Sequence, residues 1–376
     1  MKTIKVMTVF GTRPEAIKMA PLIKQLESTP GIESKVCVTA QHREMLDMVL
    51  ELFKIKPDHD LDIMKHGQTI SDITNRVLKG LEGVLKSDRP DLILVHGDTT
   101  TTFVGALAAF YEKIPVGHVE AGLRSGNKYS PYPEEMNRIL TSQLSNLHFA
   151  PTVQNYNNLM AGGISADNIY ITGNTVIDAL IQVVKDDYVF NDTVLDNIDF
   201  LNKKVILVTC HRRENWGKPM EDIFNAIRDI VHTHEDVEVV FPVHLNPQIK
   251  SLAQNILGDV ERIHLIEPLD YEPFVNILNK SYLILTDSGG VQEEAPSLGK
   301  PILVLRTETE RPEAVEAGTV KVVGVDRDKI VNETSLLLTS QDAYNKMAGA
   351  TNPYGDGKAS ERIVEAIINN FNKILL

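Results

Sequence analysis

Short apolar runs alternate with longer amphipathic stretches along the whole chain. In the first half, the runs are rich in Val, Ile and Leu, which is typical of parallel strands buried on both faces. We interpret them as strands over residues 4–10, 35–39, 92–96, 115–119 and 147–150. The stretches between them, such as 16–26 and 70–85, have the spacing of amphipathic helices. This alternation predicts a doubly wound α/β fold.

The same pattern starts again in the second half, with apolar runs over 205–210, 237–243, 263–266, 283–286 and 302–305. A chain of 376 residues exceeds what one hydrophobic core usually serves. We therefore expect two Rossmann-like domains with parallel sheets, 1–172 and 173–358, on either side of a central cleft. The last amphipathic stretch, 359–376, follows the turn-rich segment NPYGDG and is expected to form a helix that packs back on the first domain.

Composition and motifs limit the possible binding partners, location and cofactors of the protein. The formal net charge of -13 argues against a protein that coats nucleic acid or an anionic membrane, because its overall field repels both. The two cysteines, Cys37 and Cys210, end apolar runs, as expected of buried residues in a reducing cytoplasm. The N-terminal run lacks the features of a signal peptide, and no apolar stretch reaches the roughly 20 residues that span a bilayer. Neither a G-x-G-x-x-G motif, a P-loop nor a metal-ligand spacing occurs, so no cofactor or metal is indicated.

The first glycine signal is the segment FGTRPE, residues 10–15, which follows the first strand. Gly11 permits a tight turn, and Pro14 suits the first turn of the next helix. Arg13 and Lys18 would then lie by a helix N-terminus, where the dipole, free backbone N–H groups and two cations all favour a phosphate. A strand-to-helix turn with solvated charges explains the same residues, and this motif alone does not decide between the two.

The second glycine signal is TDSGG, residues 286–290, where an apolar strand ends and a helix starts. Gly289 and Gly290 let backbone N–H groups approach a ligand closely, and Ser288 adds a hydroxyl donor. Glu293 and Glu294 would repel a phosphate but can accept hydrogen bonds from ribose hydroxyls, so a nucleoside diphosphate suits both features. Alternatively, the two glutamates only interact favourably with the helix N-terminus.

Polar groups gather where the predicted strands of the first half end, which is where ligands bind in open α/β sheets. The segments HGDTTTT, GHVEAGLR and YPEEMNR carry Asp98, Glu120 and Glu134. In the second half CHRREN also ends a strand, and we expect His211 and nearby arginines to face these carboxylates across the cleft. Carboxylates at such positions serve as general acids and bases once burial and neighbours tune them. Each of them alone could instead be a helix cap or an ion-pair partner.

Taken together, these and further motifs resemble those of one enzyme family. In chain order they are GTRPEAIK, TAQHREM, HGDTTTT, HVEAGLR, YPEEMNR, CHRREN, PVHLNP, LTDSGGVQEEAPSLGKP, TERPEA and NPYGDG. In order and spacing they resemble the bacterial non-hydrolysing UDP-N-acetylglucosamine 2-epimerases, from the first strand to the last helix. The resemblance implies the GT-B architecture, a homodimer, and interconversion of UDP-GlcNAc with UDP-ManNAc that supplies ManNAc for surface polymers such as teichoic acid linkage units or capsules.

The resemblance also implies roles for residues. UDP would be held by Arg13, His211, Ser288, Gly289, Gly290 and Glu294, with Glu294 on the ribose and Phe274 beside the uracil. The catalytic positions would be Lys18, Asp98, Glu120, Glu134 and His211. The implied reaction eliminates UDP to leave 2-acetamidoglucal, and then adds UDP back with a proton delivered to the opposite face. Two faces require two proton-transfer groups. Our hypothesis is that Asp98 and Glu120 are the main acid/base pair and that Glu134 positions the sugar or assists.

Many members of that family bind a second UDP-GlcNAc as an activator. The matching positions here are Gln41, His42, Gln68, Glu134, Arg212 and His244, and Gly67 in the same region is Arg in some activated members. Three other interpretations compete with the epimerase: a GT-B glycosyltransferase, a hydrolysing epimerase that releases ManNAc and UDP, and a UDP-sugar-binding regulator without turnover. The absence of an appended kinase segment or a membrane-docking basic helix disfavours the first two, and the carboxylate set disfavours the third.

Overall fold

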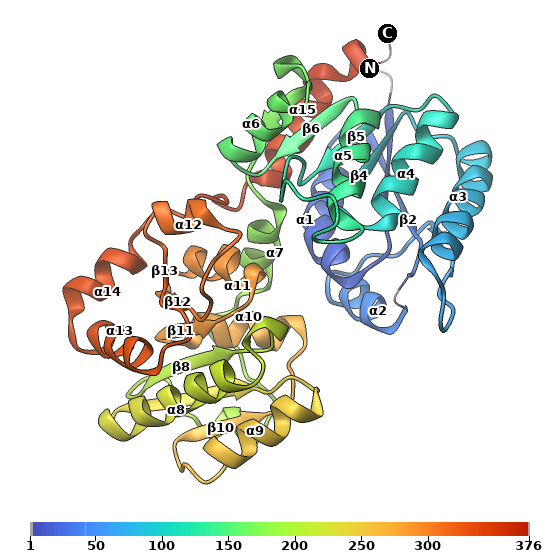
Figure 1. The fold of residues 1–376 in the computed structure, drawn as a ribbon. Coiled ribbons are helices and arrows are strands. Elements are labelled where there is room, and N and C mark those ends of the chain that lie inside the picture. Colours follow the sequence, from blue (N-terminus) through green and yellow to red (C-terminus); the bar gives the residue numbers. More distant parts are fainter. Residues whose placement is uncertain (1–2, 42, 375–376) are drawn as a thin grey trace. The chain divides into compact units, whose positions relative to one another are not determined.

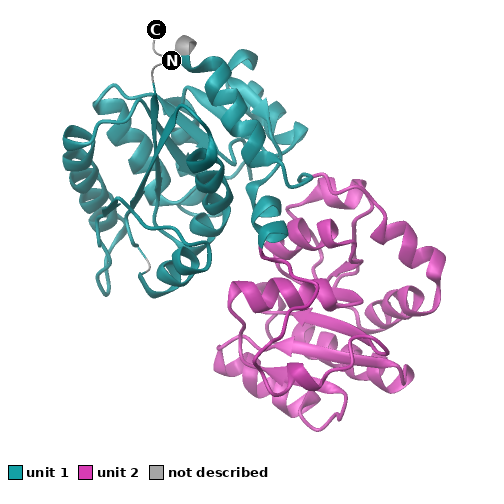
Figure 2. Cartoon of the chain, turned by 180° about the vertical axis from the view of Figure 1, so that it is seen from behind, with its two compact units in different colours: residues 1–182, 354–376 teal, residues 183–353 magenta. Residues whose placement is uncertain are grey.

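The computed structural model describes residues 3–41 and 43–374 (Figure 1). Contacts within the chain define two compact units (Figure 2). Unit 1 comprises residues 1–182 and 354–376, and unit 2 comprises residues 183–353. Each unit contains one parallel β-sheet with its own helices.

Unit 1 has a seven-stranded sheet in the order β3-β2-β1-β4-β5-β6-β7. Its strands are β1 (Ile4–Phe10), β2 (Ile32–Val38), β3 (His59–Asp60), β4 (Leu92–His96), β5 (Val116–Val119), β6 (Leu147–Ala150) and β7 (Ile169–Ile171). Its helices are α1 (Arg13–Ser28), α2 (Arg43–Leu52), α3 (Ile70–Ser87), α4 (Thr100–Tyr111), α5 (Glu134–Leu144), α6 (Val153–Ala161), α7 (Thr175–Val183) and α15 (Ala359–Ile374).

Unit 2 has a six-stranded sheet in the order β10-β9-β8-β11-β12-β13. Its strands are β8 (Lys204–Thr209), β9 (Val237–Pro242), β10 (Ile263–Ile266), β11 (Leu283–Thr286), β12 (Ile302–Val304) and β13 (Val320–Val322). Its helices are α8 (Lys218–Thr233), α9 (Pro247–Leu257), α10 (Tyr271–Lys280), α11 (Gly289–Glu294), α12 (Pro312–Glu316), α13 (Arg327–Thr339) and α14 (Gln341–Ala348).

The ten strands predicted from the sequence are confirmed within a few residues at their ends. The sequence interpretation missed β3, β7 and β13, each of which lies at an edge of its sheet. Edge strands pair on one side only and are less buried, so they lack the continuous apolar run that marks a central strand.

Both sheets are doubly wound, and in both the strand order reverses next to the first strand of the unit. In unit 1 this switch lies between β1 and β4, and in unit 2 it lies between β8 and β11. In open α/β sheets, ligands bind beyond the carboxyl ends of the strands at such a point. The fold therefore directs attention to the residues that follow β1, β4 and β5 in unit 1, and to those that follow β8 and β11 in unit 2.

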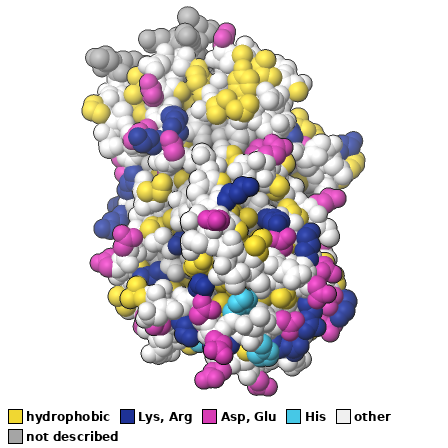
Figure 3. Space-filling model, turned by 90° about the vertical axis from the view of Figure 1, so that its left-hand side faces the viewer, with side chains coloured by type: hydrophobic (Ala, Val, Ile, Leu, Met, Phe, Trp, Pro, Cys, Tyr) yellow, Lys and Arg dark blue, Asp and Glu magenta, His cyan; other side chains and the backbone are white. Residues whose placement is uncertain are grey.

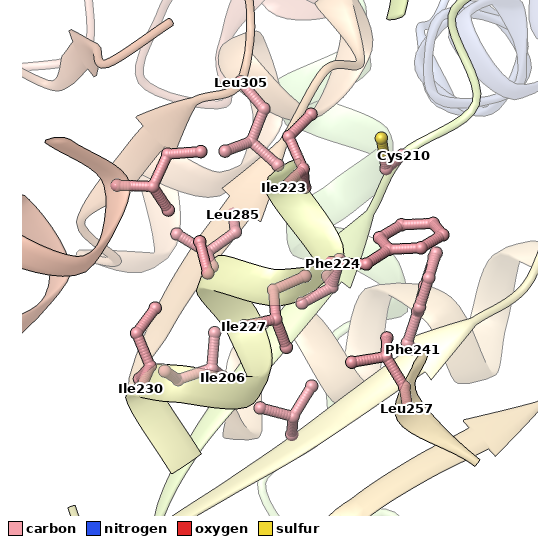
Figure 4. Packing of buried hydrophobic residues seen from close by; sticks show 14 of the residues in the cluster. Ile206, Cys210, Ile223, Phe224, Ile227, Ile230, Phe241, Leu257, Leu285 and Leu305 are labelled. Atoms are coloured by element: carbon pink, nitrogen blue, oxygen red, sulfur yellow. The ribbon is translucent and has the colours of Figure 1, made fainter. Parts of the chain in front are cut away.

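Hydrophobic packing between sheet and helices holds each unit together. In unit 2, α8 places Ile223, Phe224 and Ile227 against the sheet residues Ile206 and Phe241, all of them fully buried (Figure 4). Unit 1 has an equivalent core between its sheet and the buried faces of α3 and α4. Cores packed in this way fix the strand ends from which polar side chains project.

The last helix belongs with unit 1 (Figure 2), and α15 packs there against α1. Asp178 on α7 fixes its N-terminus, because the carboxylate accepts hydrogen bonds from the backbone N–H groups of Ala359 at 3.1 Å and Ser360 at 2.7 Å. Burial raises the pKa of Asp178, and the hydrogen bonds from Ser360 and Ala359 oppose that rise. The segment that leads out of unit 1 and the segment that returns are thus joined inside unit 1.

The surface and the cysteines agree with an ordinary globular chain. Figure 3 shows Lys and Arg side chains interspersed with Asp and Glu on the face drawn. Cys37 and Cys210 are both buried and free, as the sequence predicts. Among the described residues, none of the helices combines the length and the apolar character needed to cross a membrane.

The packing around Gly11 gives a stability prediction. A Cβ atom at this position would lie 2.0 Å from Thr39 Oγ1, which is itself 3.0 Å from Thr101 Oγ1. We expect Gly11→Ala to lower the free energy of unfolding by about 1–3 kcal/mol through overpacking. The measurement is urea unfolding followed by circular dichroism.

A matched glycine substitution serves as the control. Gly83 lies in α3, and a Cβ atom there would have no heavy atom within 4 Å. Gly83→Ala should stabilise the protein by up to about 1 kcal/mol, because alanine favours a helix more than glycine does. Equal stability of the Gly11→Ala variant and the wild type would refute the close-packing role of Gly11.

Candidate active site

The carboxyl ends of β1, β4 and β5 bring together the polar residues of unit 1. Asp98 follows β4 after one glycine, and Glu120 follows β5 directly. The two strand ends are joined, since Gly97 N donates to Val119 O at 2.9 Å and His118 Nε2 lies 2.7 Å from Gly97 O. The structure thus places two of the predicted catalytic carboxylates at adjacent strand ends, with Asp98 beside the switch point of the sheet.

Glu120 is held by nitrogen atoms from three other segments. Its Oε2 atom lies 2.5 Å from Lys18 Nζ on α1, 2.9 Å from Asn174 Nδ2 before α7, and 3.7 Å from His96 Nε2 at the end of β4. The backbone of Glu120 has a φ of 59°, in the left-handed region that a residue with a Cβ rarely adopts. Strain of this kind persists only where surrounding contacts determine the conformation, and it is common at functional sites.

These contacts affect the protonation of Glu120 and His96. Burial alone would raise the pKa of Glu120, but the charge of Lys18, the nearby His96 ring and the donated hydrogen bonds together lower it well below the usual range. Burial lowers the pKa of His96 to about 4, so this ring is neutral at physiological pH. Neither ring nitrogen of His96 has a hydrogen-bond partner among the described residues, although both are buried. Glu120 is therefore an ionised carboxylate beside a neutral imidazole that can still donate or accept a hydrogen bond.

Asp98 is held by a second cation. Arg138 on α5 donates from Nε to Asp98 Oδ2 at 2.9 Å, and its Nη2 atom lies 2.7 Å from the same oxygen. The other side of the guanidinium donates to Glu135 at 3.0 Å, and Glu135 also accepts from the backbone N–H groups of Ser125 and Gly126. Glu134 is the first residue of α5, one turn before Arg138, and is partly exposed.

The structure corrects our view of the first glycine turn. We expected free backbone N–H groups there, but those of Gly11 and Thr12 donate to the buried carboxylate of Glu15, at 3.0 and 2.8 Å. Burial raises the pKa of Glu15, and hydrogen bonds from Thr99, Gly11 and Thr12 oppose that rise. Glu15 Oε1 also accepts from Thr99 Oγ1 at 2.7 Å. Glu15 thus connects the β1 turn to the β4 turn, and the N–H groups of Gly11 and Thr12 are not free to bind a phosphate.

In unit 2 a buried aspartate organises the end of β8. Asp287 follows β11, is fully buried, and accepts hydrogen bonds from the backbone N–H groups of His211 and Arg212, both at 2.8 Å. Its other oxygen lies 3.3 Å from His211 Nδ1. Burial lowers the pKa of His211, Asp287 opposes this, and the nearby His244 adds to the lowering. The rings of His211 and His244 stack with centroids 5.6 Å apart.

The second glycine turn differs from the first in the space around its glycines. A Cβ atom at Gly290 would have its nearest neighbour, Glu294 Oε1, at 3.5 Å, and one at Gly289 would lie 3.4 Å from the guanidinium of Arg311. Both distances are ordinary contacts, so packing within the chain does not demand glycine at either position. Bare backbone at the start of α11, with Ser288 before it and a guanidinium alongside, suits close approach by an anion.

Charged side chains lie close to this turn and interact with one another and with α10. Arg311 donates from Nε to Glu293 Oε1 at 2.7 Å. The hydroxyl of Tyr271 is buried without a hydrogen-bond partner among the described residues, and its pKa is raised by burial and by the neighbouring Glu294. Phe274 lies in the first turn of α10, on the same helix as Tyr271. The nucleotide set that the resemblance assigned to unit 2 thus comes from the ends of β8 and β11, from α11 and from α10.

The activator set is divided between the units. Gln68 accepts from Arg76 at 3.0 Å, and Gln41 has a buried Oε1 atom without a partner among the described residues. His42 lies outside the described residues. Arg212, whose Nε atom is buried and likewise unpartnered, and the exposed His244 belong to unit 2. Gly67 is exposed with a φ of 70°, a backbone conformation that disfavours any larger residue there.

Sequence reasoning missed several residues that contact the predicted ones. Arg138, Asp287 and Arg311 stand inside motifs that the sequence analysis quoted, and Asp287 directly precedes the predicted UDP-binding residue Ser288. Asn174 belongs to no motif, and only the fold brings it next to Glu120. Within the described ranges, no group of three or more His, Cys, Asp or Glu side chains is placed to hold a metal ion.

Known proteins share both this sequence and this fold. A family model described as UDP-N-acetylglucosamine 2-epimerase matches residues 24–368. The UDP-N-acetylglucosamine 2-epimerase of Bacillus subtilis strain 168 is 59% identical over 371 residues, which cover 99% of this chain and 97% of that protein. The crystal structure of UDP-GlcNAc 2-epimerase from Neisseria meningitidis bound to UDP-GlcNAc matches with a TM-score of 0.85 and 53% identity, covering 98% of this chain and 100% of that one.

A more distant match concerns the fold alone. The glycosyltransferase of kitacinnamycin matches with a TM-score of 0.66 at 11% identity, over 97% of this chain and 100% of that one. Two Rossmann-like units of this kind form the GT-B architecture, as the sequence analysis expected. The family model and the identity over the whole length go further than the fold, and this chain belongs to the UDP-N-acetylglucosamine 2-epimerase family.

Proposed function

We propose that this chain interconverts UDP-GlcNAc and UDP-ManNAc by inverting C2, without releasing free sugar. Membership of the family supports the substrate. The observation that carries the chemistry is the placement of Asp98 and Glu120 after the adjacent strands β4 and β5, each carboxylate next to a cation. Inversion needs one proton-transfer group for each face of the sugar, and two neighbouring carboxylates can supply them.

The reaction begins with elimination. The C2–H bond of the sugar lies next to no carbonyl, so removing that proton alone would leave a poorly stabilised carbanion. In the proposed step a carboxylate takes the C2 proton as the bond between C1 and the UDP oxygen breaks, which gives UDP and 2-acetamidoglucal. Re-addition returns the UDP oxygen to C1 while the other carboxyl group delivers a proton to C2 from the opposite face. The delivering carboxyl group must carry a proton before re-addition, and the cycle balances when the first carboxyl group then loses its proton to solvent and the second regains one from it.

Lys18 affects both proton transfer by Glu120 and departure of the UDP leaving group. In the ligand-free protein it neutralises Glu120 at 2.5 Å, which makes that carboxylate a weak base. A substrate diphosphate offers Lys18 a second, doubly charged partner. When Lys18 shares its charge with the diphosphate, the basicity of Glu120 rises and the leaving group is stabilised at the same time.

Unit 2 supplies the nucleotide side of the proposal. The bare backbone of Gly289 and Gly290, with Ser288 and Arg311 beside it, suits the diphosphate, and Glu294 can accept from ribose hydroxyls. His211 is presented by Asp287 with a lowered pKa, so it is neutral and can act as a donor. We place Phe274 beside the uracil and Arg13 with the UDP-binding residues.

Oligomeric state, regulation and product use complete the proposal. We propose a homodimer, which is supported by apolar side chains left exposed, such as Phe110 and Tyr111 at the end of α4. A second UDP-GlcNAc acts as an activator through Gln41, His42, Gln68, Glu134, Arg212 and His244. The product supplies ManNAc units for surface polymers, such as teichoic acid linkage units or capsules.

Product analysis tests the proposed reaction directly. Purified protein is incubated with UDP-GlcNAc alone, without an acceptor or a nicotinamide, and the products are separated by ion-exchange chromatography. We expect a mixture of the two UDP-sugars whose sum equals the starting amount. Release of UDP with free sugar would indicate hydrolysis, a requirement for an acceptor would indicate a glycosyltransferase, and no change would indicate a binding protein.

Replacing Asp98 by Asn tests its role in proton transfer. The Asn carbonyl can still accept from Arg138, so the fold should be kept while the acid/base function is lost. We expect kcat to fall by about 10²–10⁴-fold, with the Kd for UDP within about twofold of wild type. Kinetics and calorimetric titration of UDP measure the two quantities.

Asp58→Asn is the matched control for this variant. Asp58 is also a unit 1 carboxylate paired with a cation, at 3.0 Å from Lys35, but it lies outside the site. This control should retain wild-type kcat. Near-normal turnover of the Asp98→Asn variant would remove Asp98 from the mechanism.

The proposed activator predicts a dependence on substrate identity. Rigorously purified UDP-ManNAc alone should be converted slowly, and a trace of UDP-GlcNAc should remove this lag. Progress curves with and without added UDP-GlcNAc provide the measurement. Full initial velocity from pure UDP-ManNAc would contradict activation by a second UDP-GlcNAc.

A further inference from the structure

Asn174 lies where the chain leaves unit 1. It stands between β7 and α7, is 3% exposed, and precedes the helix that carries the chain to Val183. Its backbone N–H donates to Tyr354 O at 2.7 Å, on the segment that returns from unit 2. The neighbouring Gly173 has a φ of 87°, and a Cβ atom there would lie 3.3 Å from Gly355 Cα. The outgoing and returning segments therefore pack closely at Asn174.

The side chain of Asn174 uses both ends of its amide. Oδ1 accepts from the backbone N–H of Val176 at 3.0 Å, which caps the first turn of α7. Nδ2 donates to Glu120 Oε2 at 2.9 Å. One buried residue thus contacts both segments that join the units and also Glu120, the carboxylate to which we assign proton transfer.

Asn174 differs from the other donors around Glu120 because its amide does not titrate. The titratable groups that face the carboxylate are Lys18 from α1 and His96 from β4. A cation at 2.5 Å strongly stabilises the ionised form and reduces its basicity, whereas an amide N–H fixes the oxygen with a smaller effect on proton affinity. If Lys18 shares its charge with a diphosphate, as the proposed function has it, the hydrogen bond from Asn174 still holds Glu120 Oε2.

We propose that Asn174 is a positioning residue for the reaction: it holds Glu120 Oε2 and ties the orientation of that carboxylate to the two segments that connect the units. The inference rests on the proposed function. In this role Asn174 is not itself a proton-transfer group. Its loss would act through Glu120.

Two variants test this role in the full-length protein. Asn174→Ala removes both the cap and the hydrogen bond to Glu120. Asn174→Asp keeps the shape and the cap, since aspartate caps helices as well as asparagine does, but it places a carboxylate against Glu120. Asp326→Ala is the control for capping alone, because Asp326 caps α13 in unit 2 by accepting from Lys329 N at 2.9 Å.

The kinetic readouts separate positioning from a structural role. For Asn174→Ala we expect kcat to fall by about 10–100-fold, the size of loss that a small misplacement of a reacting group produces, with an unchanged Kd for UDP. Removing a donor from a carboxylate raises its pKa, and Glu120 must be ionised to act as a base. The acidic limb of the kcat/KM profile should therefore move to higher pH in Asn174→Ala. It should move further in Asn174→Asp, where two carboxylates repel each other.

The outcomes are distinct. A lower kcat with a shifted acidic limb in both variants, and wild-type kinetics in Asp326→Ala, supports the proposal. Wild-type kcat in Asn174→Ala, or a loss that is equal at every pH with an unmoved limb, overturns it. If the wild type itself fails to interconvert the two UDP-sugars, the proposed function fails, and this result is visible before either variant is measured. If Asn174→Ala does not fold, the same criteria apply to Asn174→Asp.

Discussion

A buried carboxylate must be matched by charge and hydrogen bonds, and the site of unit 1 is built around one that is. Glu120 meets Lys18, Asn174 and His96 at the end of a parallel sheet. These partners come from α1, from the start of α7 and from β4, which are far apart in the sequence. The parallel sheet makes their meeting possible, because it delivers successive strand ends to one edge. A carboxylate neutralised in this way is also a poor base. Its basicity must therefore depend on whether Lys18 gains another anionic partner.

The two units use one topology for two kinds of chemistry. Both sheets reverse their strand order beside the first strand, and both place a glycine turn there. In unit 1 the turn is closed by its own glutamate, and Gly11 is required by packing against Thr39. In unit 2 the glycines after Ser288 have space around them and a guanidinium beside them. This difference favours nucleotide binding by unit 2 and proton transfer by unit 1.

The sequence predicted the central strands, the two sheets and the polar strand ends, because buried parallel strands leave long apolar runs and ligand sites follow them. Edge strands such as β3 escaped, since two residues paired on one side carry no such pattern. The placement of Asp98 and Glu120 at strand ends could be predicted, because Glu120 directly follows β5 and Asp98 follows β4 after one glycine. Asn174 could not, because its partner is 54 residues away and an Asn after a glycine looks like any turn. The role of Glu15 could not be predicted either, since the sequence GTRPE does not show which groups its carboxylate binds.

Exchange of the C2 hydrogen with solvent tests the central claim most directly, which is that carboxyl groups of unit 1 remove and return this proton. Purified enzyme is incubated with UDP-GlcNAc in deuterated water, and C2 of both UDP-sugars is followed by NMR. Proton transfer through carboxyl groups predicts deuterium at C2 in both sugars, while the other ring carbons keep their hydrogen. Interconversion of the two sugars with the original hydrogen retained at C2 would contradict it.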